Sequence, residues 1–322
     1  LIKLLIKHKK INIKYLCGNN SVGKDISLYD KSLKKKNLPK IIKFKDFLLK
    51  DIEIIFTALP NGEAQLISKK LLKKNILIDL AGDFRLNKAS SYFKWYKKEH
   101  KAPNLIKKSI YSLPELTGNK IKKFQIIGCP GCYPTSILIP IIPLIKKNLI
   151  KKDSIIIDSK SGYSGAGRSV HKKHKNKNLY ESISAYGVGF HRHNSEIEQM
   201  IKNYTKHKFK FTFTPHLSPM FRGILTTIYV DLARGKTIIN LFNELKKFYK
   251  KEKFVKIARL NSPVSTNDVI NTNNCKISIC KSKYKDKAII LSSIDNLIKG
   301  GAGQAIQNMN ILKNFDINEG LR

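Results

Sequence analysis

The chain has 322 residues, enough for about two domains that each bury a core. Its 62 Lys and Arg against 23 Asp and Glu give a formal net charge of +39, which by itself suggests a nucleic-acid or acidic-membrane partner. Only seven of these cations are Arg, the better residue for bidentate recognition of phosphates and base edges, and the Lys residues are dispersed along the chain. We therefore interpret the Lys excess as solvated surface and expect no nucleic-acid partner. A Lys-rich nucleic-acid binder without catalysis is the alternative outside the enzymes.

Apolar content and cysteine usage exclude other classes. Hydrophobic residues make up 42% of the chain, which is typical of a folded protein and excludes disorder as the main state. The longest apolar run, Ile137 to Ile145, has nine residues, against roughly 20 required to span a bilayer, so we expect no membrane partner. Five cysteines, an odd number, suit free thiols in a reducing compartment, and we predict a cytoplasmic location.

Strand and helix patterns alternate through the first half of the chain and then give way to longer strands. Hydrophobic periodicity predicts helices over 1–10, 63–74 and 134–147, and strands over 11–16, 52–59, 76–81 and 124–127. Such alternation predicts a parallel sheet covered on both faces. Later strands are predicted over 155–158, 209–214 and 223–231, which indicates a mixed or antiparallel sheet. We place the change of domain near Cys132.

The stretch Gly128 to Thr135 reads GCPGCYPT and lies between a predicted buried strand and a predicted helix. A cysteine at a helix N-terminus faces the positive end of the helix dipole, which favours the thiolate and lowers its pKa. We therefore predict that Cys132 is a nucleophile, the alternative being a small buried cysteine at a tight turn. Cys129 and Cys132 also form the C-x-x-C motif of thiol–disulfide oxidoreductases, but its position in the middle of the chain argues against that class.

Two further stretches carry candidate site residues. Ser161 to Arg168 reads SGYSGAGR, in which glycines let the backbone approach a ligand and Arg168 can hold a charged oxygen; an ordinary hairpin loop is the alternative. His191 and His193 alternate as at a strand end, which places their rings on opposite sides, one facing the cysteine. A Cys–His pair is the minimum for a thiol nucleophile with a general acid–base. Zinc is the competing ligand, but a second ligand pair at zinc spacing is lacking, so we expect no metal.

Two late stretches suit anion binding. Pro215 to Ile224 contains His216 and Arg222 at the entry to a strand, which suits a substrate carboxylate. Asp295 to Ala305 is a glycine-rich helix start that can approach an anion or a cofactor. The structural alternatives are a surface loop and a helix cap, respectively.

Taken together, these segments resemble the N-acetyl-gamma-glutamyl-phosphate reductase family of arginine biosynthesis over nearly the full length. The resemblance rests on six segments in the family's order, at 79–86 (DLAGDFRL), 130–135, 161–168, 191–193, 215–224 and 295–305. It implies NADPH-dependent reduction of N-acetyl-L-glutamyl 5-phosphate to N-acetyl-L-glutamate 5-semialdehyde and phosphate, through a cysteine thioester. Reductases of aminoadipyl or aspartyl phosphates are alternatives within the class, because pocket shape sets substrate length.

The resemblance also implies roles for individual residues. Cys132 matches the family's nucleophile and His191 its general acid–base. The residues expected to bind the anionic groups of this small acyl-phosphate substrate are His193, His216 and Arg222. The residues expected near NADP(H) are Ser161, Gly162, Asn296, Lys299 and Gly300.

The implied fold is α/β. It combines a Rossmann-type parallel-sheet cofactor domain, residues 1–131 and 296–322, with a mixed α+β catalytic and oligomerisation domain, residues 132–295. The second domain resembles that of glyceraldehyde-3-phosphate dehydrogenase. Relatives form dimers or tetramers, so we expect a homodimer or a homotetramer.

Two departures from the family pattern affect the expected cofactor site. The family's first strand and Gly-rich phosphate loop have no match, so we expect an N-terminally truncated cofactor domain. The residues after 11–16 include no acid to hold a ribose 2′-hydroxyl, which favours NADP over NAD and assigns the 2′-phosphate to Lys24.

A third departure concerns Cys129, where relatives commonly have Asn. We hypothesise that oxidation joins Cys129 to Cys132 and silences the enzyme.

Overall fold

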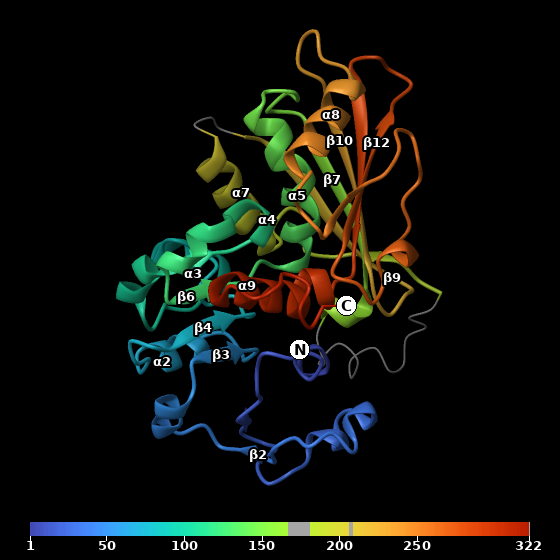
Figure 1. Cartoon of the computed structure of the whole chain (residues 1–322). Helices are drawn as coiled ribbons and strands as arrows, with labels where there is room; N and C mark the ends of the chain where they lie inside the picture. The colour runs from blue at the N-terminus through green and yellow to red at the C-terminus, as the bar shows by residue number, and fades with distance from the viewer. Residues whose placement is uncertain (167–180, 206–208, 322) are drawn as a thin grey trace.

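The computed structural model describes residues 1–166, 181–205 and 209–321. A large mixed sheet and its helices form one region, and small parallel sheets with surrounding helices form the other (Figure 1). Together the two sheet types confirm the predicted α/β fold. Among the described helices, none has the length and apolar composition required to cross a bilayer.

The mixed sheet has seven strands in the order β11-β12-β13-β10-β7-β9-β8. β7 is parallel to β9 and β11 to β12, whereas the other neighbours are antiparallel. The strands are β7 (Ile155–Gly162), β8 (Ser184–Ala185), β9 (Phe211–Ser218), β10 (Ile224–Asp231), β11 (Val255–Ile257), β12 (Cys275–Lys281) and β13 (Lys287–Ile294). The predicted strands at 155–158, 209–214 and 223–231 are thus confirmed as β7, β9 and β10.

Alternation along these strands separates a buried face from an open one. Ile157, Ile228 and Ile290 are fully buried in the large core beneath α5 (Cys132–Lys146). Successive strand residues point to opposite faces, so the residues next in sequence to these three isoleucines face away from α5. Of these, Ile156 is 52% and Tyr229 45% exposed, and the two are paired across β7 and β10. We call this the open face of the sheet.

The other region has two parallel sheets. One has four strands in the order β3-β4-β6-β5, and the other pairs β1 with β2. The strands are β1 (Leu16–Cys17), β2 (Ile41–Ile42), β3 (Ile54–Thr57), β4 (Ile76–Asp79), β5 (Ser109–Tyr111) and β6 (Ile126–Gly128). The predicted strands at 52–59, 76–81 and 124–127 thus form, with slightly different ends.

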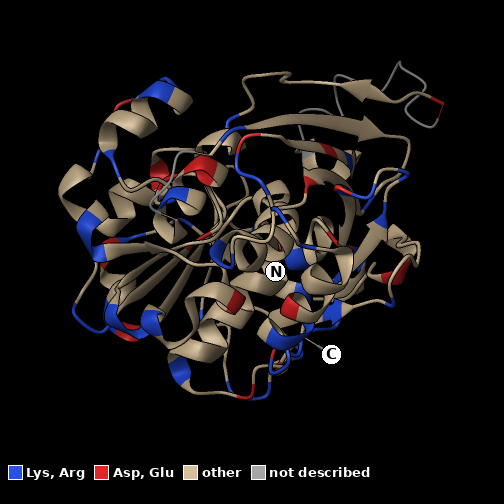
Figure 2. Cartoon of the chain, turned by 90° about the horizontal axis from the view of Figure 1, so that it is seen from above, with Lys and Arg blue, Asp and Glu red and all other residues tan. Residues whose placement is uncertain are grey.

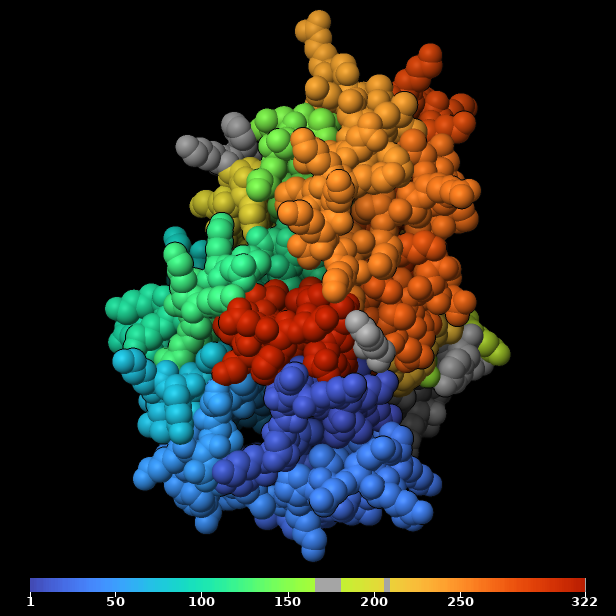
Figure 3. All heavy atoms as spheres, in the orientation of Figure 1, coloured from blue at the N-terminus to red at the C-terminus, as the bar shows by residue number. Residues whose placement is uncertain are grey.

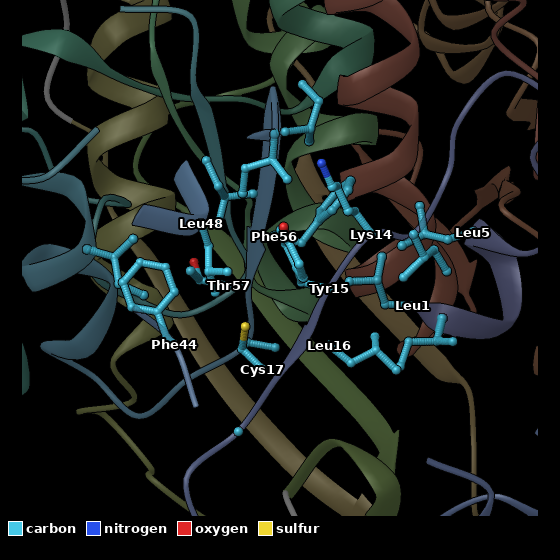
Figure 4. A pocket seen from close by; sticks show the side chains of 18 of the residues that line it. Leu1, Leu5, Lys14, Tyr15, Leu16, Cys17, Phe44, Leu48, Phe56 and Thr57 are labelled. Atoms are coloured by element: carbon cyan, nitrogen blue, oxygen red, sulfur yellow. The ribbon is translucent and has the colours of Figure 1, made fainter. Parts of the chain in front are cut away.

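The segment 11–16 was predicted as a strand, but only its last residue is in one. A cavity of about 1210 Å³ lies beside it and is lined by every residue of 10–19 and of 51–60 (Figure 4). A cavity over a sheet face is lined by alternate residues, so this lining shows that the cavity runs along two strand edges. In the space-filling view it opens between the dark-blue and lighter-blue segments (Figure 3). The segment therefore has a hydrogen-bonding partner on one side alone, at β2.

Helices complete both regions. The α-helices are α1 (Ile2–Leu5), α2 (Glu63–Ser68), α3 (Ala89–Tyr96), α4 (Pro114–Thr117), α5, α7 (His193–Tyr204), α8 (Ile238–Phe248) and α9 (Gly303–Lys313), and a π-helical turn, η8 (Ile298–Ala302), leads into α9. Short 3-10 helices are η1 (Ile26–Leu28), η2 (Lys31–Leu33), η3 (Asp46–Asp51), η4 (Pro103–Lys108), η5 (Gly118–Lys123), η6 (Tyr163–Ala166) and η7 (Thr266–Asp268). The helices predicted at 1–10 and 63–74 are shorter than expected. α9 lies between the two regions (Figure 1) and packs Ile306 and Met309 against Ile78 and Ile127 of the four-stranded sheet.

Candidate functional site

Cys132 is the first residue of α5, directly after the loop that follows β6. Gly131 is the N-cap, and the Thr135 hydroxyl donates to its carbonyl at 2.9 Å, which fixes the first turn. The thiol lies at a helix N-terminus, as predicted for a nucleophile. The predicted lowering of its pKa, however, is wrong in direction. Burial raises the pKa of Cys132 above its ordinary value and outweighs the Arg85 charge and the Tyr133 backbone N–H, both of which lower it. The sulfur is therefore held as a thiol at neutral pH.

The two histidines lie together, contrary to the prediction that their rings point to opposite sides. His193 begins α7, so the pair sits at a helix start and not at a strand end. The ring centroids of His191 and His193 are 4.7 Å apart, edge to face. The His191 ring also meets the rings of Tyr133 at 5.7 Å, Tyr186 at 5.5 Å and Phe213 at 5.7 Å. His191 is thus fixed in an aromatic box beside the residue that follows Cys132.

Burial keeps both imidazoles neutral. It lowers the pKa of His191 to about 4, with a smaller contribution from the adjacent Arg192 charge, and it lowers the pKa of His193 well below its ordinary value. The backbone N–H of His193 donates to Nδ1 of His191 at 3.2 Å. Because Nδ1 accepts this bond, the neutral ring carries its proton on Nε2 and can donate it to an oxygen.

A buried ion pair supports the loop before Cys132. Arg85 Nη1 lies 3.0 Å from Glu196 Oε1, and Arg85 Nε donates to the Cys129 carbonyl at 2.8 Å. Glu196 Oε2 accepts from the Gly131 backbone N–H at 2.9 Å and from the Tyr111 hydroxyl at 3.0 Å. Arg85 lies in the segment 79–86 and Glu196 lies three residues after the segment 191–193, but neither residue was predicted to have a role. The spacing of Glu196 three residues after His193 was the available signal, because it places both side chains on one helix face.

The glycine-rich segment and the start of η8 also reach the nucleophile. Asn296 accepts from the Gly223 N–H at 2.8 Å and donates to the Ser164 hydroxyl at 3.0 Å. A Cβ on Gly300 would lie 2.6 Å from the Cβ of Cys132, so the backbone passes directly against the cysteine. Ser161 and Gly162 end β7, where the Ser161 hydroxyl donates to the Gly162 carbonyl at 3.1 Å. Arg168 lies outside the described residues.

Three predicted site residues, His216, Arg222 and Lys299, each have a polar side-chain group close to a carboxylate of the protein. His216 Nδ1 lies 3.0 Å from Asp158 on the open face of the sheet, the face opposite Phe213 and Tyr133, so the structure does not bring it to Cys132. Strand alternation is the physical reason: residues 213 and 216 are three positions apart on β9, so their side chains point to opposite faces of the sheet. The Arg222 guanidinium binds Asp295 at 3.1 Å. The Lys299 ammonium is fully buried against Glu115.

Cys129 differs from Cys132 in its surroundings. It is buried in the core of the four-stranded sheet, and its sulfur lies 3.8 Å from the Asn308 side-chain amide. Burial raises its pKa to about 12, so the sulfur is an inert thiol in this fold. Across the described part of the chain, no group of three or more His, Cys, Asp or Glu side chains is placed to hold a metal ion.

Comparisons with known proteins agree with this architecture. The model of the semialdehyde dehydrogenase NAD binding domain matches residues 1–124, and that of the semialdehyde dehydrogenase dimerisation domain matches residues 132–296. Among solved structures, aspartate semialdehyde dehydrogenase II of Vibrio cholerae complexed with ASA superposes with a TM-score of 0.71 at 13% identity, covering 97% of this chain and 94% of that chain. Aspartate semialdehyde dehydrogenase of Candida albicans with NADP gives 0.67 at 17% identity, over 97% and 94%. These two likenesses show the fold.

Curated relatives are closer in sequence. The N-acetyl-gamma-glutamyl-phosphate reductase of Clostridium beijerinckii is 43% identical over 324 residues, covering 100% of this chain and 93% of the relative. A probable chloroplastic N-acetyl-gamma-glutamyl-phosphate reductase of Arabidopsis thaliana is 39% identical over 321 residues, covering 100% of this chain and 80% of the relative. Neither relative is an aminoadipyl or aspartyl reductase or a nucleic-acid binder, so the alternatives are not favoured. The chain belongs to the N-acetyl-gamma-glutamyl-phosphate reductase family and is an NADP-dependent, phosphorylating oxidoreductase of arginine biosynthesis, which reduces N-acetyl-L-glutamyl 5-phosphate to N-acetyl-L-glutamate 5-semialdehyde and phosphate.

Proposed function

We propose that Cys132 is the nucleophile of this reaction. Its sulfur attacks the acyl carbon, the C–S bond forms, and the bond from carbon to the phosphate oxygen breaks as phosphate leaves with the electron pair and takes up the thiol proton. The acyl group is then held as a thioester, which divides the reduction into two steps. The observation that carries the proposal is the place of Cys132 at the start of α5, next to the aromatic box of His191. Free backbone N–H groups at a helix start can stabilise the oxyanion that forms on the substrate carbonyl.

We assign the general acid–base role to His191. The imidazole is neutral at pH 7 and carries its proton on Nε2, so this N–H can donate a hydrogen bond to the oxyanion of the tetrahedral intermediate. When sulfur leaves as a thiolate at the end of the reaction, a proton from solvent restores the thiol, and the adjacent ring relays it. His193, beside it, is the candidate for the substrate's anionic groups, together with Arg222; His216 is left out of this proposal because its Nδ1 lies 3.0 Å from Asp158 on the open face.

The residues present fit both the 2′-phosphate end and the nicotinamide end of NADP(H). Dinucleotides bind at the carboxyl ends of parallel strands, and Gly18 and Asn19 follow β1 without an acidic residue, near the exposed Lys24. At the other end, Gly300 passes against Cys132, and Asn296 bonds to the Ser164 hydroxyl in the segment that follows Ser161 and Gly162. When bound, the cofactor supplies the hydride that reduces the thioester carbon. Lys24 would hold the 2′-phosphate, and Asn296 would orient the nicotinamide end.

We further propose that residues 1–131 and 296–322 form the cofactor domain and residues 132–295 the catalytic domain. The packing of Ile306 and Met309 against Ile78 and Ile127 supports the return of the C-terminal helix to the first domain. The cavity between β1 and β3 supports the prediction that a first strand belongs to this sheet.

For the assembly, we propose a homodimer or homotetramer built on the open face. That face presents the paired Ile156 and Tyr229, each about half exposed, on a large sheet. We propose no nucleic-acid partner, because Lys and Arg are scattered over the surface and interspersed with acidic residues (Figure 2). A cytoplasmic location remains a prediction from the cysteines alone.

Trapping the acyl-enzyme tests the assignment of Cys132. The enzyme is mixed with N-acetylglutamyl phosphate in the absence of NADPH, quenched in acid and digested, and the peptides are analysed by mass spectrometry. The expected result is an N-acetylglutamyl group on the peptide that contains Cys132. Acylation of another cysteine, with Cys132 unmodified, would overturn the proposal.

A further inference from the structure

The interior holds a fully buried ion pair that the proposed chemistry does not use. Lys299 of η8 and Glu115 of α4 have side chains with 0% exposure, and the ammonium binds Glu115 Oε1 directly. Lys299 also donates to Gln307 Oε1 at 2.9 Å. Desolvation of two charges is costly, and apolar residues of similar volume are often as stable or more stable at such a place. The pair therefore calls for a role other than stability.

The ion pair closes a network that fixes η8 to its neighbours. The Gln307 side-chain amide donates to Glu115 Oε1 at 2.9 Å, and the Asn273 amide donates to Gln307 Oε1, also at 2.9 Å. Lys299, Glu115 and Gln307 thus bind one another in a ring of three, supported by Asn273. Because these bonds are directional, they set both the rotation of η8 and its position along its axis.

The segment fixed in this way is the one that contacts the nucleophile. The backbone of Gly300, the residue after Lys299, passes against Cys132 so closely that a Cβ would lie 2.6 Å from the cysteine Cβ. One turn later, the Gln304 amide donates to Thr135 Oγ1 at 3.1 Å and to the Pro130 carbonyl at 3.4 Å. Pro130 and Thr135 lie on either side of Cys132, so this segment holds the start of α5 at three points.

We propose that Lys299 and Glu115 are positioning residues for Cys132. Their charge pair fixes η8 and the start of α9, and these in turn fix the direction of the thiol through Gly300 of η8 and Gln304 of α9. The inference rests on the proposed role of Cys132 as nucleophile. Misplacement of a reacting group by about 1 Å can cost roughly 100-fold in rate, so loss of the network should lower kcat without loss of substrate binding.

The test compares K299M, E115M and the double variant K299M/E115M, each in the full chain. The single variants leave one buried charge without its partner and are expected to lose stability, whereas the double variant buries no charge and should fold. The expected result for the double variant is a kcat lowered by about tenfold or more, with both KM values within about twofold. Alkylation of Cys132 by iodoacetamide, followed by mass spectrometry of its peptide, should also change in rate.

Matched variants make the outcomes decisive. K287M removes the lysine of the more exposed Lys287–Asp231 pair and should leave kcat unchanged. Q304L removes the two bonds to the start of α5 without burying a charge, and a severalfold loss of kcat is expected. A folded double variant with the kcat and alkylation rate of the wild type would overturn the inference, as would an unchanged kcat in Q304L should the double variant not fold. C132A separates the two proposals, because turnover in C132A would refute the proposed nucleophile itself.

Discussion

The carboxylate of Glu196 accepts a hydrogen bond from the backbone N–H of Gly131 at 2.9 Å, one residue before the nucleophile. The same carboxylate pairs with Arg85 in the protein interior. Through this bond, the helix that begins with His193 is tied to the loop that begins the helix of Cys132. His193 and Cys132 therefore share one buried support.

Replacing Glu196 by Gln should destabilise the protein strongly. Arg85 would lose its buried partner, and loss of one member of a buried pair typically costs about 3–5 kcal/mol. Chemical denaturation of E196Q measures the free energy of unfolding. D231N is the control, because it breaks the more exposed Lys287–Asp231 pair, for which about 1 kcal/mol or less is expected. Equal effects of the two variants would show that the buried pair has no special role.

Stability should fall as the pH is lowered from about 6.5 towards 4. Burial lowers the pKa of His191 to about 4 in the folded state, so in this window the unfolded chain binds a proton at His191 that the folded protein does not bind. His193 adds to the effect in the same direction. Urea unfolding across this pH range measures the slope, which should become smaller in H191Q. An unchanged slope in H191Q would contradict the neutral state assigned to His191.

Cys132 should react as a thiol of raised pKa in the free enzyme. Burial raises this pKa, so alkylation by iodoacetamide should titrate at a higher pH than that of an unstructured peptide cysteine, about 8.5. Cys129 serves as an internal reference, because burial raises its pKa to about 12 and it should stay unlabelled while the protein is folded. Mass spectrometry of the two peptides follows both sulfurs. A midpoint near pH 7 in the pH dependence of Cys132 alkylation would instead favour the dipole-stabilised thiolate expected from the sequence.

The open face of the large sheet should carry the subunit contact. Tyr229 is 45% exposed there, and a lysine at this position would place a charge in a face-to-face contact. We expect Y229K to lower the mass measured by light scattering towards that of a monomer. Y284K is the control, since Tyr284 is 59% exposed in the turn between β12 and β13, away from the middle of that face. The same mass in both variants and the wild type would place the contact elsewhere.

Local patterns predicted the local structure well. The apolar stretches at 155–158 and 223–231 marked β7 and β10, and the start of α5 after a Pro-Gly-Cys turn placed Cys132 correctly. The position of His216 on the open face was also readable, because strand parity separates it from Phe213, but the predicted role in substrate binding followed the motif instead.

Long-range features were beyond the sequence. Arg85 and Glu196 are 111 residues apart, and Lys299 and Glu115 are 184 apart, so no periodicity links either pair. The predicted lowering of the Cys132 pKa was wrong in direction. A helix N-terminus can be recognised in a sequence, whereas burial by distant segments cannot. The strand 11–16 failed to form over its length for a similar reason, since a strand requires a neighbour on its edge.

The most direct test of the account is NADP reduction with N-acetyl-L-glutamate 5-semialdehyde and phosphate, measured for the wild type and for C132A. The account predicts phosphate-dependent reduction by the wild type and a loss of roughly 10³-fold or more in C132A, since thioester formation needs the sulfur. Circular dichroism of C132A shows whether its fold is intact. Turnover in C132A at the wild-type rate would contradict the central claim.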